Sequence, residues 1–313
     1  MAQHTIGALT IVESGPTTTH LGMTSVDFPT NAELSGNDSG AIYEEFQAIT
    51  GFSPVASITS KSVTELIAMI GLNGQCVGTG KAITQVDVIS RKVETCQTAL
   101  GSTPHVRDRV TTGLLRLGSL TAERGQDATL SVILDTLTDG TNAPVARTDG
   151  VAMVTPVVAE RLTLGLCSIA GSTWPEIEGV SLEFNVSIGD KTPALGAIWS
   201  DTVSVLTVRP VLTIRGRDLS KVSAALIAAT SNVATHANTI IQLIRRKSGA
   251  AFEPFGNSVH TTITMAGMLV PDNLVSAAAN QRATTTLRLA GAFDGTNAPV
   301  LFNVATTYDT TPG

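Results

Sequence analysis

The chain has 313 residues, enough for about two domains of ordinary size. Apolar residues make up 42%, charged residues only 15%, and the net charge is −6. This balance argues against a protein that holds nucleic acid through its phosphates. The longest apolar stretch, Val222–Ala229, is far shorter than the roughly 18–20 residues that cross a bilayer, and the start of the chain lacks the pattern of a secretion signal, so we expect no membrane segment and no export. The sparse charge favours a surface largely covered by other subunits.

Three cysteines, Cys76, Cys96 and Cys167, are an odd number without CxxC spacing. Such a set indicates reduced thiols of a protein made in a cytosol, and neither a disulfide framework nor a zinc site.

The first half of the chain contains one predicted helix and several strand patterns. Ser60 or Ser62 is expected to cap the helix VTELIAMI, which Gly71 would end. Strand-like VDVISRKV follows at residues 86–93, and QDATLSVIL at 126–134 leads to DGTNAPV. The Asp139-Gly140 pair favours a tight hairpin turn, because glycine tolerates positive φ.

The second half gives the same kinds of signal. VSLEFNVSI at 180–188 and ATTTLRLAG at 283–291 alternate apolar and polar residues, as half-buried strands do. In SVLTVRPVLTI at 204–214, Pro210 cannot donate a ladder hydrogen bond, which predicts an edge, a bulge or a strand end; Pro54 is its counterpart. Asp218 or Ser220 would cap a second helix, LSKVSAALIAAT, and DGTNAPV recurs at Asp294 and Gly295.

The repeated heptapeptide is the best-preserved part of a match that covers most of the chain. Shifted by 156 positions early and 155 late, the second half aligns with the first in unbroken order: 21–28 with 177–184, 58–70 with 214–226, 86–93 with 241–248, and 126–134 with 281–289. The sequence therefore predicts two homologous domains, 1–156 and 157–313. We expect a mainly β protein in which each domain is an antiparallel β-sandwich or barrel with one packed helix.

Chemical motifs are scarce. GxSxG, HExxH and P-loop spacings are missing, so we expect no catalytic residues, no metal and no cofactor. His105 and His260 align in the repeat and are predicted to be structural or interfacial. Two aligned basic pairs, Arg91-Lys92 and Arg246-Lys247, suit either a phosphate-binding strip or ion pairing with a neighbouring subunit. The acidic chain favours ion pairing, with Glu44, Glu45, Asp87 and Glu94 as candidate partners.

The duplicated core TSVDF/VSLEF, the helix TELIAMI/SKVSAAL and the closing strand with DGTNAPV resemble the major tail tube protein of long, non-contractile bacteriophage tails. The resemblance implies a structural virion protein and no enzyme. In members with two fused tube domains, three copies make one pseudo-hexameric ring, and rings stack into a hollow tube through which the genome passes. Implied partners are further copies of the chain, a tape measure protein and tail tip or terminator proteins. The double-stranded DNA would pass without specific binding. The implied location is the virion tail, assembled in the host cytoplasm.

If that role holds, two polar, turn-rich segments are candidate inter-ring loops: one with Gly36, Asn37 and Asp38, and one with Gly189, Asp190 and Lys191. Ordinary solvent-exposed hairpin tips are the alternative for each. The net negative charge also predicts an acidic lumen that repels DNA phosphates.

Two other functions stay open at this stage. One is a capsid decoration or surface-lattice protein made of tandem β-sandwiches. The other is a carbohydrate-binding module or enzyme, which would need clustered aromatic residues or paired carboxylates. Only four Trp and Tyr residues are present, and the aligned Tyr43 and Trp199 are predicted to be core residues.

Overall fold

A computed structural model describes residues 3–12, 18–37, 46–72, 80–93, 101–153, 161–169, 171–189, 191–193, 198–217, 236–246, 252–293 and 299–310. Over these residues the protein is mainly β, and its strands pair antiparallel in several sheets with one α-helix between them. The predicted fold class is confirmed at this level: a large sheet with smaller sheets is compatible with a β-sandwich.

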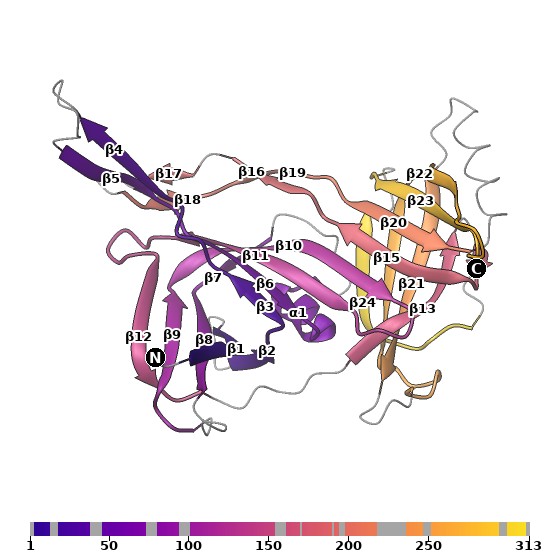
Figure 1. The fold of residues 1–313 in the computed structure, drawn as a ribbon, viewed down its shortest axis with the longest axis horizontal. Helices are drawn as coiled ribbons and strands as arrows, with labels where there is room; N and C mark the ends of the chain where they lie inside the picture. Colours follow the sequence, from indigo (N-terminus) through magenta and orange to yellow (C-terminus); the bar gives the residue numbers. More distant parts are fainter. Residues whose placement is uncertain are drawn as a thin grey trace.

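The largest sheet runs through both halves of the chain (Figure 1). Eleven strands follow one another in it, and two more pair off this path: β24 (Val300–Thr306) with β22, and β7 (Lys81–Ile83) with β10. The order along the sheet is β14 (Ser172–Trp174), β13 (Arg161–Ile169), β21 (His236–Arg246), β22 (His260–Ser276), β23 (Thr284–Gly291), β20 (Val211–Gly216), β15 (Ile177–Glu183), β10 (Thr112–Glu123), β11 (Thr129–Leu137), β6 (Val55–Ser60) and β3 (Ser25–Asp27).

A second sheet belongs to the first half of the chain. Its order is β12 (Val145–Val151), β9 (His105–Val110), β8 (Gln85–Val93), β1 (Gln3–Val12) and β2 (Thr18–Gly22). Only Thr111 separates β9 from β10, so the chain crosses here from one sheet to the other. The equivalent strand in the second half, β22, makes the same crossing without interruption: it pairs with β21 and β24 early and with β23 late.

Two hairpin arms extend from the body. Arm 1 is β4 (Ala32–Asn37) paired with β5 (Phe46–Phe52), and it projects past one end of the molecule (Figure 1). Arm 2 is β16 (Val186–Ile188) with β19 (Val205–Val208), followed by β17 (Thr192–Pro193) with β18 (Ser200–Thr202). Arm 2 runs from β15 and β20 back across the first half of the chain, towards the base of arm 1 (Figure 1).

The helix α1 (Val63–Ile70) lies where the sequence predicts it. Ser62 is the N-cap residue but makes no side-chain cap bond; instead Ser60 Oγ accepts the Ser62 N–H at 3.1 Å. Gly71 ends the helix at φ 74°, the left-handed conformation that glycine adopts at little cost. The predicted second helix, at 219–230, lies outside the described residues.

Both halves pack around one hydrophobic core. Buried residues of α1, β6, β10 and β11 from the first half belong to the same cluster as those of β13, β15, β20, β22 and β23 from the second. The two predicted domains therefore share a core over the described residues. The boundary predicted at 156 falls in residues 154–160, outside them, so the exact division stays a prediction. Residues 1–156 are called repeat 1 below, and residues 157–313 repeat 2.

Strand pairing follows the same order in the two repeats. In repeat 1, β3 pairs with β6, β6 with β11 and β11 with β10; in repeat 2, β15 pairs with β20, β20 with β23 and β23 with β22. Registers agree at one end of the long strands, where Thr121 faces Thr129 and Ser276 faces Thr284, each pair displaced by 155; at the other end they differ by one residue, since Gly113 faces Thr136 but Met268 faces Ala290.

Two stretches of the sequence alignment were wrong by two residues. The 86–93 stretch is displaced by 153 and not by 155, because Lys92 and Arg245 hold the same place opposite the aligned histidines. The other stretch is at β3. Asn31 and Asn185 both have φ 45°, and their side-chain amides donate at 3.2 Å to the carbonyls of Ser53 and Arg209. The displacement of β3 against β15 is thus 154, and not the 156 that the similarity of TSVDF to VSLEF indicated. Side chains at short apolar-polar alternations match equally well after a shift of two, so such a pattern cannot fix the register.

The other strand predictions differ little from the structure. The 283–291 segment is confirmed as β23. The 180–188 segment is two strands, β15 and β16, because Asn185 adopts positive φ between them. Pro210 ends a strand, as predicted: it separates β19 from β20, and its carbonyl accepts the Gly291 N–H at 2.8 Å. Pro54 has the equivalent role, since its carbonyl accepts the Thr136 N–H.

Candidate functional site at the join of the repeats

The two repeats are joined edge to edge by antiparallel pairing of β10 with β15. Ser119 faces Glu183 and Glu123 faces Gly179, and two flanking hydrogen bonds extend the pairing: Phe184 N–H to Gly118 O at 3.1 Å, and Arg124 N–H to Glu178 O at 2.9 Å. The strand that repeat 1 contributes, β10, is not the equivalent of the strand that repeat 2 contributes, β15. The two homologous repeats therefore meet head to tail. A contact of this kind, when it is repeated, builds rings or helical filaments.

Apolar side chains fill the inner face of this join. Leu120 faces Leu182, and Ala122 faces Val180. Leu120 and Leu182 are fully buried, and the other two are nearly so. Burial of these side chains stabilises the join by the ordinary hydrophobic effect.

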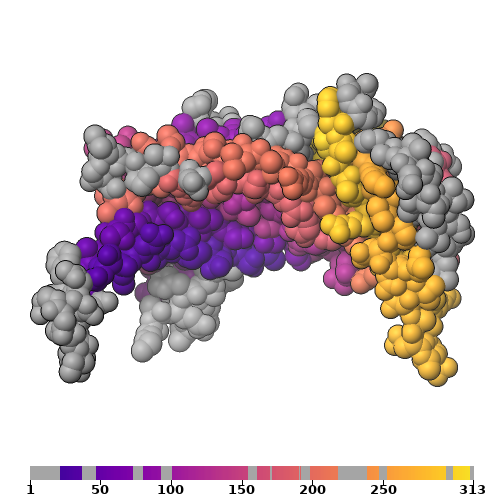
Figure 2. All heavy atoms as spheres, turned by 90° about the horizontal axis from the view of Figure 1, so that it is seen from above, coloured from indigo at the N-terminus to yellow at the C-terminus, as the bar shows by residue number. Residues whose placement is uncertain are grey.

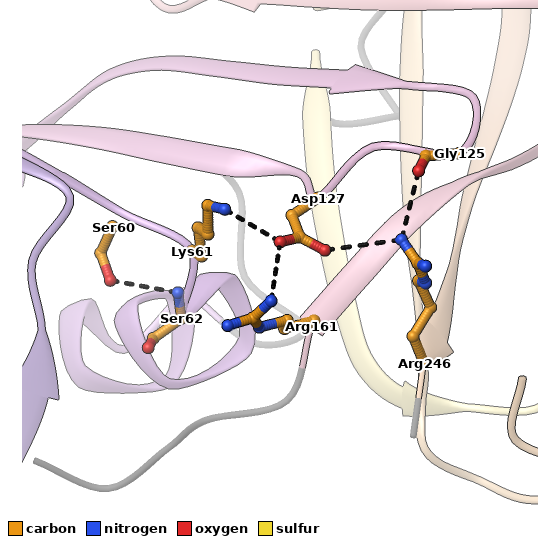
Figure 3. Close-up of polar contacts among 7 residues, drawn as sticks. All are labelled: Ser60, Lys61, Ser62, Gly125, Asp127, Arg161 and Arg246. Carbon is orange, nitrogen blue, oxygen red and sulfur yellow. Dashed lines mark hydrogen bonds and ion pairs between the residues drawn. The ribbon is translucent and has the colours of Figure 1, made fainter. Parts of the chain in front are cut away.

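Beside the paired strands, the carboxylate of Asp127 lies close to three basic side chains, Lys61, Arg161 and Arg246 (Figure 3). This cluster is called the Asp127 clamp below. Asp127, in the turn between β10 and β11, lies 2.9 Å from Lys61 of its own repeat. From repeat 2, Arg161 lies 3.3 Å away and Arg246 lies 3.7 Å away. Arg246 also donates to the Gly125 carbonyl at 3.2 Å, so the same side chain holds the turn by two contacts.

Arm 2 forms a third contact between the repeats. Arg116 of β10 lies 2.7 Å from Asp135 of β11 and donates to the Val186 carbonyl of arm 2 at 3.2 Å. Lys191 of arm 2 lies 3.3 Å from the same Asp135, whose side chain is almost fully buried. Backbone bonds from Phe52 and Thr138 of repeat 1 to Ile198 and Ser200 of repeat 2 continue the contact.

The predicted basic pairs fall at different places. Arg91 and Lys92 lie on β8, and Arg246 lies on β21, where it belongs to the Asp127 clamp within the chain; Lys247 is outside the described residues. Of the predicted acidic partners, Asp87 pairs with Arg109 of the next strand at 2.7 Å, and this hydrogen bond raises the pKa of Arg109. Glu44, Glu45 and Glu94 are outside the described residues. Ion pairing between subunits by the basic pairs stays a prediction.

The predicted inter-ring loops belong to the arms. Gly36 and Asn37 end β4 of arm 1. Gly189 and Lys191 lie within arm 2, where Lys191 contacts Asp135. Asp38 and Asp190 are outside the described residues, and a role between rings stays a prediction for both segments.

The first DGTNAPV segment is a turn but not the predicted β-hairpin. Strand β11 before it pairs with β10 and β6, whereas β12 after it pairs with β9, so the segment connects two sheets. Gly140 has φ 86°, as expected of it, and Asp139 accepts the backbone N–H groups of Thr141 and Asn142. The side-chain hydrogen bond from Asn142, helped by those backbone bonds, lowers the pKa of Asp139 to about 2. In the second copy, Asp294 and Gly295 are outside the described residues.

The aligned histidines are buried in matching positions. Lys92 N–H donates to His105 Nδ1, and Arg245 N–H donates to His260 Nδ1, each at 3.1 Å. His260 Nε2 lies 3.1 Å from the Pro254 carbonyl. Each ring accepts a backbone donor from the adjacent strand, the arrangement expected of structural histidines.

Chemistry-bearing groups elsewhere are few among the described residues. No cluster of three His, Cys, Asp or Glu side chains suits a metal ion there, and no described helix is long and apolar enough to cross a membrane. Cys167 is a free thiol whose burial raises its pKa to about 12; Cys76 and Cys96 are outside the described residues. A charged depression of about 440 Å³ adjoins the join and includes Arg124, Arg215 and the pair of Arg217 with Glu178 at 2.5 Å.

Sequence reasoning missed the residues that hold the repeats together. Asp127, Asp135 and Arg116 carry no recognisable motif. One signal was available: Gln126-Asp127-Ala128 aligns with Gln281-Arg282-Ala283, a charge reversal inside an otherwise matched segment. Such a reversal marks a position with different neighbours in the two repeats.

No protein-family model matches the chain, and no curated protein matches it significantly.

Proposed function

We propose that this chain is the repeating subunit of a hollow tube of the bacteriophage tail-tube kind. Three copies would form a pseudo-hexameric ring, and rings would stack into a tube through which double-stranded DNA passes without specific binding. The role is structural and not catalytic. Further copies of the chain are its main partners, and a tape measure protein and tail tip or terminator proteins follow from the resemblance, as does a location in the virion tail.

The observation that carries the proposal is the head-to-tail join between the repeats. The edge of β10 meets the edge of β15, so one sheet continues from repeat 1 into repeat 2. A wall that continues by the same kind of join from chain to chain closes into a ring when the rotation at each join divides a full turn. Two fused repeats halve the number of joins that must form by collision, because the internal join is made at high effective concentration.

Negative-stain electron microscopy of the purified, concentrated protein at low salt tests the proposal. We expect hollow tubes or stacked rings with three chains per ring. Closed trimers that never stack would instead support a surface-lattice protein. Dispersed monomers at high concentration, also after addition of preformed tail tips as nuclei, would contradict the proposal.

A further inference from the structure

Each repeat has one further edge that matches an edge of the join and has no partner among the described strands. In β22, pairing with β21 ends at Met268, and the stretch beyond it pairs only with β23 among the described strands. In β3, the described pairing is with β6 alone. The late part of β22 is equivalent to β10 at a displacement of 155, and β3 is equivalent to β15 at a displacement of 154. These two edges are therefore the equivalents of the edges that meet within the chain. The part of repeat 2 drawn in orange to gold projects from the body at the end away from arm 1 (Figure 2).

The backbone of β3 is oriented for the same pairing as β15. The Pro29 carbonyl accepts the Val55 N–H of β6, so residues 25, 27 and 29 direct their backbone groups to β6. In an antiparallel strand the alternate residues, Val26, Phe28 and Thr30, then direct theirs to the outer edge. Pro29 has no N–H to donate, but its backbone faces β6, so the outer edge of β3 loses no hydrogen-bond donor there.

Side chains at these edges are apolar but uncovered. Leu120 and Leu182, fully buried at the internal join, correspond to Val275 and Phe28; Val275 is 56% exposed, and Phe28 is half-buried against the core. Ala122 and Val180 correspond in the same way to the exposed Ala277 and the half-buried Val26. Leu274, beside this row, is 48% exposed. An exposed apolar sheet edge is a template for pairing with another chain.

We propose that β22 of one copy pairs antiparallel with β3 of the next copy, with Val275 opposite Phe28 and Ala277 opposite Val26. This second join repeats the internal one between chains, and it rests on the proposed function, for which it supplies the contact that closes the ring. The partner is therefore a second copy of this chain, bound by its opposite end.

Arm 1 of the incoming copy has a matching place on repeat 2. Arm 2 lies over Arg116 and Asp135 of repeat 1, whose equivalents in repeat 2 by strand pairing are Val270 and Ala290. A cavity of about 230 Å³ is lined there by these two residues together with Pro271, Asp272 and Arg288. Arms 1 and 2 share their register and their bulge, so arm 1 reaches this cavity as arm 2 reaches its own site. Its exposed Leu34 and Ile49 suit the apolar residues of this lining better than the ion pairs at the equivalent place in repeat 1.

The Asp127 clamp is a further contact that the second join does not repeat. Arg282 stands at the position equivalent to Asp127, so no carboxylate is available there to bind three basic neighbours. The second join therefore depends on backbone pairing and apolar side chains, and we expect it to be less sensitive to salt than the internal join.

A disulfide between copies tests the register. Across an antiparallel pair, disulfides form most readily at residues whose backbones do not bond each other, where the Cα atoms are close. In the proposed join one such pair is Asp27 with Ser276, both exposed. The variant Asp27→Cys/Ser276→Cys, with Cys76 and Cys96 replaced by serine, is oxidised under assembly conditions. We expect the single-chain band on a non-reducing gel to give way to bands of two and three chains.

Two pairs serve as controls. Thr121→Cys/Ser181→Cys occupies the equivalent place in the internal join and must link within one chain. Ser25→Cys/Ser276→Cys has the register that the sequence alignment indicated and must link much less. If tubes form but Asp27→Cys/Ser276→Cys does not link while the internal control does, the proposed join is wrong and the tube function stands. If linked chains form without rings or tubes, the join stands and the tube function is wrong.

Discussion

At the residue scale, Asp127 connects the two repeats through three basic side chains. Its carboxylate lies within 4 Å of Lys61, Arg161 and Arg246, and its side chain is only 12% exposed. Asp127→Asn leaves these basic groups near a neutral amide, and loss of such partly buried charged contacts costs about 1–3 kcal/mol. We expect the free energy of unfolding in urea to fall by that amount. Asp201→Asn, on an exposed position of β18, is the control and should change it little.

Asp139 gives the turn between the sheets a dependence on pH. Its pKa in the folded chain is about 2, below the ordinary value of 3.8, because Asn142 and Thr141 donate hydrogen bonds to the ionised carboxylate. A lowered pKa means that the contribution to stability is present above about pH 4 and is lost as the pH falls through about 2.

The amide resonances of Thr141 and Asn142 report this loss in an NMR titration from pH 5 to below 2. We expect both to shift with a midpoint near 2, and the shifts to vanish in Asp139→Asn. A midpoint near 4 would show that the hydrogen bonds do not favour the ionised form.

At the element scale, mutations at equivalent positions in the two repeats should change the free energy of unfolding by very different amounts. Leu120 of β10 is fully buried at the internal join, whereas its equivalent Val275 of β22 is 56% exposed. Leu120→Ala should lower the free energy of unfolding by about 2–5 kcal/mol, as for other fully buried leucines. Val275→Ala should change it by no more than about 0.5 kcal/mol.

Assembly should show the reverse sensitivity. Val275→Asp places a charge on the proposed edge, so we expect a stable monomer that forms no rings in sedimentation or electron microscopy. Val275→Thr keeps the branched shape and should still assemble. Normal assembly of the aspartate variant would show that β22 is not part of the interface between copies.

Elements were easier to predict than their partners. The helix α1 and strand β23 follow from periodicity and from the glycine and proline positions, because those signals are local. The turn at Asp139 was predicted as a hairpin, but whether β11 and β12 pair depends on distant strands, which a tight-turn signal does not report. The order of duplicated segments was correct, yet the register of β3 against β15 required the paired asparagines Asn31 and Asn185. The charge reversal at Asp127 marks a difference between the repeats, but its basic partners could not be predicted, since they come from three separate segments.

At the scale of the whole molecule, the two repeats meet as neighbours in a wall would meet. Sheet, arm and helix all contribute: β10 pairs with β15, arm 2 lies over repeat 1, and Thr64 of α1 lies 3.5 Å from Thr261 of repeat 2. If the join between chains is equivalent, the choice of which repeat comes first in the polypeptide is arbitrary.

A circular permutant tests this equivalence directly. In the natural chain nine residues connect the end of β12 at Val151 to the start of β13 at Arg161. Fusion of Gly313 to Met1 gives a connection of the same length, nine residues, from the end of β24 at Thr306 to the start of β1 at Gln3. A chain that runs 157–313 and then 1–156 would therefore hold the proposed β22–β3 join inside one polypeptide, and the β10–β15 join would form between copies.

We expect this permutant to build rings of the same diameter and symmetry as the natural chain, because the set of joins around the ring is unchanged. Its stability should depend more strongly on protein concentration, since the buried leucines of the β10–β15 join are now shared between copies. Electron microscopy compares the diameters, and thermal unfolding over a hundredfold range of concentration measures the second effect. A permutant that has a β-rich circular dichroism spectrum but stays monomeric, under conditions where the natural chain forms tubes, would show that the two joins are not equivalent and that the ring closes through other surfaces.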